Sequence, residues 1–93
     1  MAKEGKGFYQ LERLVRGFSN HRRIEILELL KKTPELSVVE ISILLRINFK
    51  TAAEHTRRLA IAGMVLKRND NHSVRHKLSD RGEQVLKFLR TLE

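Results

Sequence analysis

The chain has 93 residues, 41% of them hydrophobic and 32% charged, which suits one folded domain with a single core. It contains no cysteine, no stretch near the roughly 20 apolar residues of a membrane span and no apolar N-terminal signal segment. Disulfides, thiolate metal sites and a membrane helix are therefore excluded, and we expect a cytoplasmic protein. The net charge is +8, and the excess of Lys and Arg is concentrated in residues 46–81, which favours either a polyanion-binding face or a generic basic surface.

Two helices are predicted first. Apolar residues recur at helical spacing over residues 8–18. Asn20 then offers an N-cap for a second helix over residues 21–32. The apolar residues of this second helix cover more than one face, which predicts a central place in the core. Thr33 and Pro34 end it.

A helix-turn-helix is predicted over about residues 37–63. Ser37 and Glu40 have the spacing of a capping box at the start of a short helix. Asn48 is a suitable N-cap for a longer helix over residues 49–62, and Gly63 follows as its C-terminal glycine. A short helix, a tight turn and a longer helix are typical of this motif. The buried face of the short helix is predicted to consist of Val38, Ile41, Leu44 and Leu45.

A β-hairpin is predicted over about residues 64–79, and a last helix over residues 80–92. The hairpin turn is the Asn-Asp-Asn cluster at 69–71, and residues 73–78 alternate with the period of a strand. The predicted fold class is therefore mainly α with a small β-hairpin wing, a winged helix-turn-helix, and residues 1–93 form a single domain.

Four segments resemble the ArsR-like winged helix-turn-helix transcription regulators in their order and spacing. They are residues 17–30, residues 36–45, the pattern Asn-x-x-Thr-x-x-x-His-x-x-x-Leu-x-x-Ala-Gly-Met-Val at 48–65, and Arg-x-x-Leu-Ser-x-x-Gly at 75–82. The resemblance implies a DNA-binding protein whose terminal helices form a dimer. The chain departs from the family at Arg46, where many relatives have glycine, and at Thr56 and Ile61, where a core leucine and a charged residue are usual. It also lacks the thiolate metal-sensing motif of some relatives.

The candidate DNA-binding residues lie on the second helix of the helix-turn-helix and on the hairpin. Lys and Arg can donate to guanine in the major groove and Glu can accept from cytosine, while a basic hairpin can bind the backbone or the minor groove. The candidates are Asn48, Phe49, Lys50, Thr51, Ala53, Glu54, Arg57 and Arg58 on the helix, and Lys67, Arg68, Arg75 and Lys77 on the hairpin.

Metal binding and catalysis are not predicted. His72 and His76 are four residues apart, but no further ligands complete a metal site. We expect His55 to pack or to form a hydrogen bond. The sequence has no glycine-rich phosphate loop and no paired-carboxylate spacing, so we expect no enzyme, no metal and no cofactor.

The terminal helices carry more large apolar residues than one core of this size needs. They could cover the core of their own chain, but we expect them to form the interface of a homodimer. The predicted interface residues are Phe8, Leu11, Leu14, Val15, Phe18, Val85, Phe88, Leu89 and Leu92, with Leu86 in the same layer.

The predicted function is a sequence-specific regulator of transcription that binds double-stranded DNA as a homodimer. Two alternatives remain: a nonspecific architectural or chromatin DNA-binding protein, and a winged helix that serves as a protein-interaction module. The sequence identifies neither the operator nor a small-molecule effector, and it does not separate the ArsR-like from the MarR-like subgroup.

Overall fold

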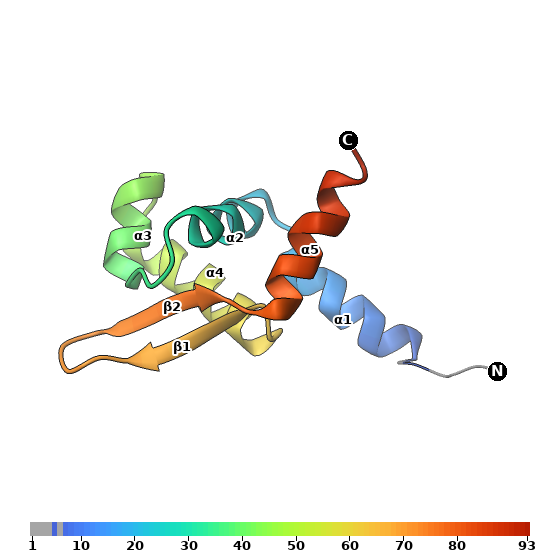
Figure 1. The fold of residues 1–93 in the computed structure, drawn as a ribbon, viewed down its shortest axis with the longest axis horizontal. Coiled ribbons are helices and arrows are strands. Elements are labelled where there is room, and N and C mark those ends of the chain that lie inside the picture. Colours follow the sequence, from blue (N-terminus) through green and yellow to red (C-terminus); the bar gives the residue numbers. More distant parts are fainter. Residues whose placement is uncertain (1–4, 6) are drawn as a thin grey trace.

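The computed structural model describes residue 5 and residues 7–93. The described residues form five helices and one hairpin. In Figure 1 the hairpin projects from one end of the molecule and α1 lies at the other. Within the described residues, no helix is both long and apolar enough to cross a bilayer. The elements are α1 (Phe8–Phe18), α2 (His21–Lys32), α3 (Val38–Leu45), α4 (Phe49–Ile61), β1 (Val65–Asn69), β2 (Val74–Leu78) and α5 (Asp80–Arg90).

The helix starts are fixed by the caps that the sequence predicts. The side chain of Asn20 accepts a hydrogen bond from the Arg22 N–H at 2.9 Å and so caps α2. Ser37 and Glu40 form a complete capping box on α3. Asn48 caps α4 through its side-chain oxygen. These caps confirm the predicted helix boundaries, because each satisfies backbone N–H groups that have no partner within the helix.

The turn between α3 and α4 depends on a strained residue. Arg46 adopts the left-handed conformation with φ 57° and ψ 46°, which glycine adopts without steric cost. A non-glycine residue adopts it at a cost of roughly 1–2 kcal/mol. The Arg46 N–H donates to the Ile43 carbonyl, and the Ile47 N–H donates to the Ser42 carbonyl at 3.0 Å. The turn therefore keeps its geometry without glycine.

Helix α2 occupies the centre of the core, as its sequence predicts. Ile26 and Leu27 are fully buried in it, and they pack with the other buried apolar side chains, among them Ile41, Leu59 and Met64. Thr56 is also buried, and its hydroxyl has no hydrogen-bond partner among the described residues.

The predicted buried face of α3 is wrong at one position. Leu44 is 54% exposed, whereas Ile41 and Ser42 are buried. The face that packs against α2 and α4 is therefore centred near Ile41 and Ser42. Because successive residues turn by about 100° around a helix, Leu44 falls outside that face.

The hairpin is attached to the body through the loop between α2 and α3. Strands β1 and β2 are antiparallel, with Val65 opposite Leu78 and Lys67 opposite His76. His76 also forms a β-bridge with Leu36: its N–H donates to the Leu36 carbonyl at 2.9 Å, and its carbonyl accepts from the Leu36 N–H at 3.2 Å. The root of the wing is thus a sheet edge shared by three segments of the chain.

Candidate nucleic-acid interface

Helix α4 has one buried side and one charged, exposed side. Ala52, Thr56 and Leu59 are buried against the core. The N-terminus of the helix is exposed, where the Asn48 side chain accepts from the Lys50 N–H at 2.7 Å. Of the predicted DNA-binding residues of α4, Ala53 is half-buried. The others lie on the exposed side: Phe49, Lys50, Thr51, Glu54, Arg57 and Arg58.

Glu54 pairs with both arginines of this surface. Its carboxylate accepts from Arg57 Nη2 at 3.0 Å and from Arg58 Nε at 2.8 Å. The hydrogen bonds from Arg58 and Arg57 hold the pKa of the Glu54 carboxyl below its ordinary value. The pairs are about half exposed, and exposed pairs contribute little free energy. An approaching anion can therefore replace Glu54 as the partner of either guanidinium.

The four basic candidates of the wing fall into two groups of two residues. Lys67 and Lys77 are exposed and form no ion pair with another described residue. Cross-strand partners share one face of a hairpin, and successive residues of a strand alternate between its faces. Lys67 is paired with His76 and Lys77 with Leu66, so the two lysines lie on opposite faces. The two lysines are thus available to a polyanion, one from each side of the wing.

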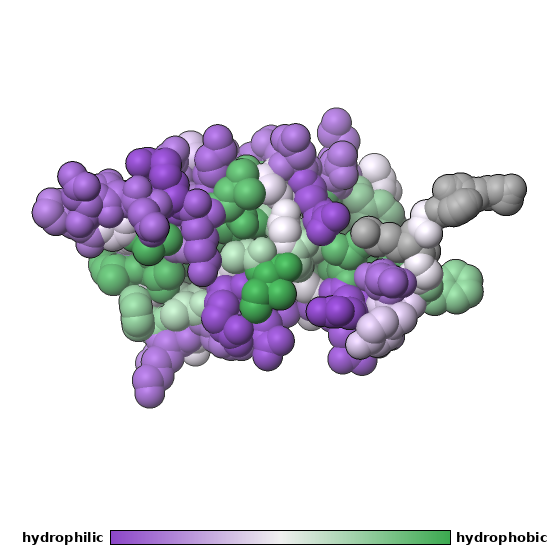
Figure 2. Space-filling model, turned by 90° about the horizontal axis from the view of Figure 1, so that it is seen from below, coloured by the Kyte–Doolittle hydropathy of each residue, from purple (hydrophilic) through white to green (hydrophobic). Residues whose placement is uncertain are grey.

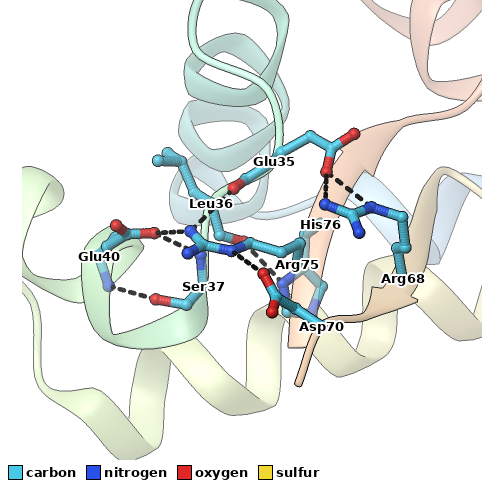
Figure 3. Close-up of polar contacts among 8 residues, drawn as sticks. All are labelled: Glu35, Leu36, Ser37, Glu40, Arg68, Asp70, Arg75 and His76. Carbon is cyan, nitrogen blue, oxygen red and sulfur yellow. Dashed lines mark hydrogen bonds and ion pairs between the residues drawn. The ribbon is translucent and has the colours of Figure 1, made fainter. Parts of the chain in front are cut away.

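Arg68 and Arg75 bind instead to the body of the protein (Figure 3). Arg68 Nε donates to the Glu35 carboxylate at 2.9 Å. Arg75 Nη1 donates to Glu40 at 2.9 Å and to the Glu35 carbonyl at 3.2 Å, and Arg75 Nε lies 3.6 Å from Asp70. Glu35 and Glu40 lie more than 30 residues from these arginines in the sequence, and no local pattern indicates the pairing. These arginines therefore fix the angle of the wing as well as adding positive charge to it.

Glu35 directs all of its polar groups toward the wing. Its carboxylate binds Arg68, its carbonyl accepts from Arg75, and its N–H donates to the His76 carbonyl at 2.7 Å. It does so in the left-handed conformation, with φ 69°. No sequence pattern indicates this role of Glu35, because glutamate is not typical of that conformation.

The histidines have structural contacts. His76 is 3% exposed, and its Nδ1–H donates to the Leu36 carbonyl at 3.0 Å. His55 Nδ1 accepts from Arg23 Nε at 3.1 Å, which confirms the predicted hydrogen bond. His72 lies exposed at the hairpin turn. Among the described residues, no three His, Asp or Glu side chains are grouped to hold a metal ion.

The predicted dimer residues lie at or near the surface of the single chain. Phe8, Leu11, Val15, Phe88 and Leu92 are between 45% and 92% exposed. Leu14, Phe18, Val85 and Leu89 are half-buried. Leu86 is 5% exposed and belongs to the core of its own chain, so its place in the predicted intersubunit layer is wrong. Val85 beside it is partly buried against the core, whereas Phe88 on the same helix is exposed.

Hydrophilic and hydrophobic side chains are interspersed on the face seen in Figure 2. Hydrophilic side chains project at the end that holds the hairpin, and hydrophobic surface lies beside them, near the middle and again near the N-terminal end, where α1 lies. The basic surface of the wing and the exposed apolar surface of α1 are thus at opposite ends of the long axis.

Solved structures with this arrangement are DNA-binding regulators. The homodimeric winged helix-turn-helix DNA-binding domain of a possible ArsR-family regulator from Mycobacterium bovis superposes with a TM-score of 0.82 at 22% identity, covering 99% of this chain and 89% of that one. The chain has an ArsR-like winged helix-turn-helix fold. HlyU from Vibrio cholerae shares this winged helix with a TM-score of 0.78 at 28% identity, over 96% of this chain and 97% of that one.

A predicted DNA-binding transcriptional regulator from E. coli also shares the winged helix, with a TM-score of 0.76 at 17% identity over 91% of this chain and 90% of that one. No protein-family model and no curated protein matches the sequence. The likeness is therefore carried by the winged-helix structure, and it confirms the predicted fold class.

Proposed function

We propose that this protein is a sequence-specific regulator of transcription that binds double-stranded DNA as a homodimer. The observation that carries the proposal is the exposed, basic face of α4 in a winged helix-turn-helix whose structural relatives are DNA-binding regulators. The protein would act where the DNA is, in the cytoplasm.

Helix α4 has the dimensions and chemistry of a recognition helix. Its 13 residues are about 20 Å long, and a helix of this width enters the major groove. Lys50 and Arg57 can donate to guanine, and Phe49, 52% exposed at the helix start, can contact a thymine methyl. Glu54 pairs with Arg57 before binding, so it presets the position of that guanidinium. The bases would be contacted by the same side chains that the helix exposes.

The wing supplies contacts to phosphate. Lys67 and Lys77, which form no ion pair with another described residue, lie on the two faces of the hairpin. Arg68 and Arg75 hold the hairpin against the loop between α2 and α3, so the lysines project from a stiff arm. Phosphate contacts position a protein on the duplex without reading its sequence.

The dimer would be formed by the exposed apolar residues of α1 and α5. Phe8 is 92% exposed and Phe88 54% exposed, and contiguous exposed apolar patches mark interaction surfaces. A two-fold dimer would present two recognition helices to successive major grooves about 34 Å apart. The preferred DNA would then be an inverted repeat with half-sites about 10 base pairs apart.

Selection of bound DNA from a random pool, followed by affinity measurements at several salt concentrations, tests the proposal. A specific regulator enriches an inverted repeat and prefers it to random DNA by roughly 10³-fold or more. An architectural protein would bind all sequences alike, with a strong salt dependence. A protein-interaction module would show no salt-dependent affinity for DNA, and either of these results would refute the proposal.

A further inference from the structure

An open pocket of about 600 Å³ lies between α1, the start of α2, the end of α4 and the start of α5. Among the described residues, its lining contains no Asp or Glu. Five of the twelve residues that line it are arginines: Arg13, Arg16, Arg23, Arg58 and Arg81.

Three of these arginines have no carboxylate partner among the described residues. The Arg13 guanidinium lies 5.9 Å from the centre of the Tyr9 ring. Arg23 donates to His55 and to the Arg16 carbonyl at 2.9 Å, and Arg81 donates to the Ala62 carbonyl at 2.9 Å. The fold therefore holds several positive charges around one hollow with no neutralising group in it, and like charges brought together repel.

The bonds to backbone carbonyls also preorganise the site. Arg23 and Arg81 are anchored by one part of the guanidinium, and each has further N–H groups to donate. Guanidinium groups bind phosphate and carboxylate through paired hydrogen bonds. An oxyanion in the pocket would therefore meet donors whose positions are already set.

Apolar side chains complete the lining. Ile61 is 62% exposed and lies beside Leu14 and Ala62 in the wall of the pocket. This is the position at which the resemblance leads one to expect a charged residue. An exposed isoleucine among arginines suits a ligand with an apolar group next to its charge.

The pocket and the proposed dimer interface lie on different sides of α1, apart from Leu14, which belongs to both. At about 100° per residue, Gln10, Arg13 and Gly17 fall on one side of α1, toward the pocket. Phe8 and Val15, which are exposed, fall on the opposite side.

We propose that this pocket binds a phosphate group. The group can come from a small organic phosphate or from the DNA backbone, and the apolar wall formed by Ile61 and Leu14 favours the small molecule. Arg58 links the pocket to the DNA-binding face, since it also pairs with Glu54, the partner of Arg57. A bound phosphate that draws Arg58 away leaves Glu54 to Arg57 alone and changes the charge that α4 presents. This link rests on the proposed function, whereas binding in the pocket does not.

Titration calorimetry of the full chain without DNA tests the site, with phenyl phosphate and inorganic phosphate as probes. We expect saturable binding of phenyl phosphate that is tighter than that of inorganic phosphate. The variant Arg13→Gln/Arg81→Gln should weaken it at least about tenfold. Arg90→Gln, which removes one positive charge from α5 outside the pocket, should leave it unchanged. Arg13→Gln alone serves if the double variant does not fold by circular dichroism, because Arg13 lies over the Tyr9 ring and forms no hydrogen bond or ion pair with another described residue.

The source of the phosphate is separated by the salt dependence of DNA affinity. An unchanged slope in the double variant, with phenyl phosphate binding lost, assigns the pocket to a small molecule. If the salt slope of DNA affinity falls by about two units in the double variant, and the wild type does not bind phenyl phosphate, the pocket is assigned to the DNA backbone. If neither effect appears, or if Arg90→Gln weakens binding equally, the proposal is wrong. Failure of the protein to bind any DNA would refute the proposed function and leave the calorimetric result standing.

Discussion

Arg75 of the wing and Glu40 of α3 are joined by a hydrogen bond of 2.9 Å. The acceptor, Glu40 Oε1, also accepts from the Ser37 N–H at 2.8 Å and thereby closes the capping box of α3. The bond to the Ser37 backbone, with a smaller contribution from Arg75, holds the pKa of the Glu40 carboxyl below its ordinary value. One carboxylate oxygen therefore serves both the start of the helix-turn-helix and the root of the wing.

Replacing Glu40 should loosen both elements together. Glu40→Ala removes the shared acceptor, so we expect a lower melting temperature and faster amide exchange both at the start of α3 and along β2. Arg75→Gln should accelerate exchange in β2 and leave α3 protected, since Ser37 keeps its partner. Exchange measured by NMR on the two variants checks this. Unchanged protection of β2 in Glu40→Ala would contradict the shared role.

Substitutions on α4 and on the wing should affect DNA binding differently. Arg57→Ala should cost about 1–3 kcal/mol on the selected site and relax the preference at one base position. Lys67→Ala should weaken all sequences similarly and lower the salt slope by about one unit, because it removes a phosphate contact. We substitute Lys67 and not Arg75 in the wing, because Arg75 also binds Glu35 and Glu40 and so supports the fold. Fluorescence anisotropy on selected and random DNA measures both effects, and an unchanged affinity of Arg57→Ala for the selected site would remove α4 from its proposed role.

The stability of the protein should fall as the pH drops below about 6.5. Burial lowers the pKa of His76, with a smaller contribution from Lys67, while the bond to the Leu36 carbonyl opposes the shift. Burial and the Arg23 charge likewise lower the pKa of His55. Between these lowered pKa values and the ordinary one, the unfolded chain binds more protons than the folded chain, so stability rises with pH through this window and is constant above it.

Urea unfolding at pH 7.5 and at pH 5.5 tests this dependence. His76→Gln can still donate to Leu36 but cannot titrate in this range, so the loss of stability between the two pH values should be smaller. His72→Gln is the control, because His72 is exposed at the hairpin turn and should leave the loss unchanged. An equal loss in wild type and His76→Gln would show that His76 does not titrate with unfolding.

Gly82→Ala should destabilise the fold although it places a better helix former in α5. A Cβ at Gly82 would lie 2.6 Å from Leu78 Cδ1 and would collide with the backbone oxygen of Met64. Alanine gains about 1 kcal/mol in helix propensity, but overpacking against backbone costs typically 1–3 kcal/mol. We expect a net loss in urea unfolding. Gly5→Ala, where a Cβ meets nothing within 4 Å, should show no loss.

A charge on the exposed apolar face of α5 should dissociate the proposed dimer without unfolding the chain. Phe88 is 54% exposed, so Phe88→Glu leaves the core intact. We expect a folded monomer by light scattering and circular dichroism, with weaker binding to the inverted repeat. Ile43→Glu, 67% exposed on α3, is the control and should remain dimeric. A wild-type chain that is monomeric at micromolar concentration and binds one half-site with full affinity would refute the dimer.

The sequence predicts the helices well because their boundaries depend on neighbouring residues. Ser37 and Glu40 are three positions apart, and Asn48 caps the residues that follow it, so the signal and its effect are local. The burial of Leu44 was predicted wrongly because eight helical residues do not determine which side faces α2. That side depends on the partner helices.

The contacts of the basic residues could not be predicted from local patterns. Arg68 was correctly placed on the hairpin, but its partner Glu35 is 33 positions away and lies next to it only in the folded chain. The arginine-lined pocket cannot be predicted from local patterns for the same reason, since residues as distant in sequence as Arg13 and Arg81 both line it. Charge counts predicted a polyanion-binding surface and could not show that the charges converge at a second place.

The left-handed backbone at position 35 favours glycine or asparagine, whereas the bond to Arg68 requires a carboxylate. Glycine or asparagine would adopt a φ of 69° more readily and recover roughly 1 kcal/mol. Neither can hold Arg68 as the glutamate carboxylate does. Selection for thermal stability alone would therefore remove this glutamate, whereas selection for a wing of fixed angle would retain it. The residue found at this position in a given lineage indicates which of the two requirements is stronger there.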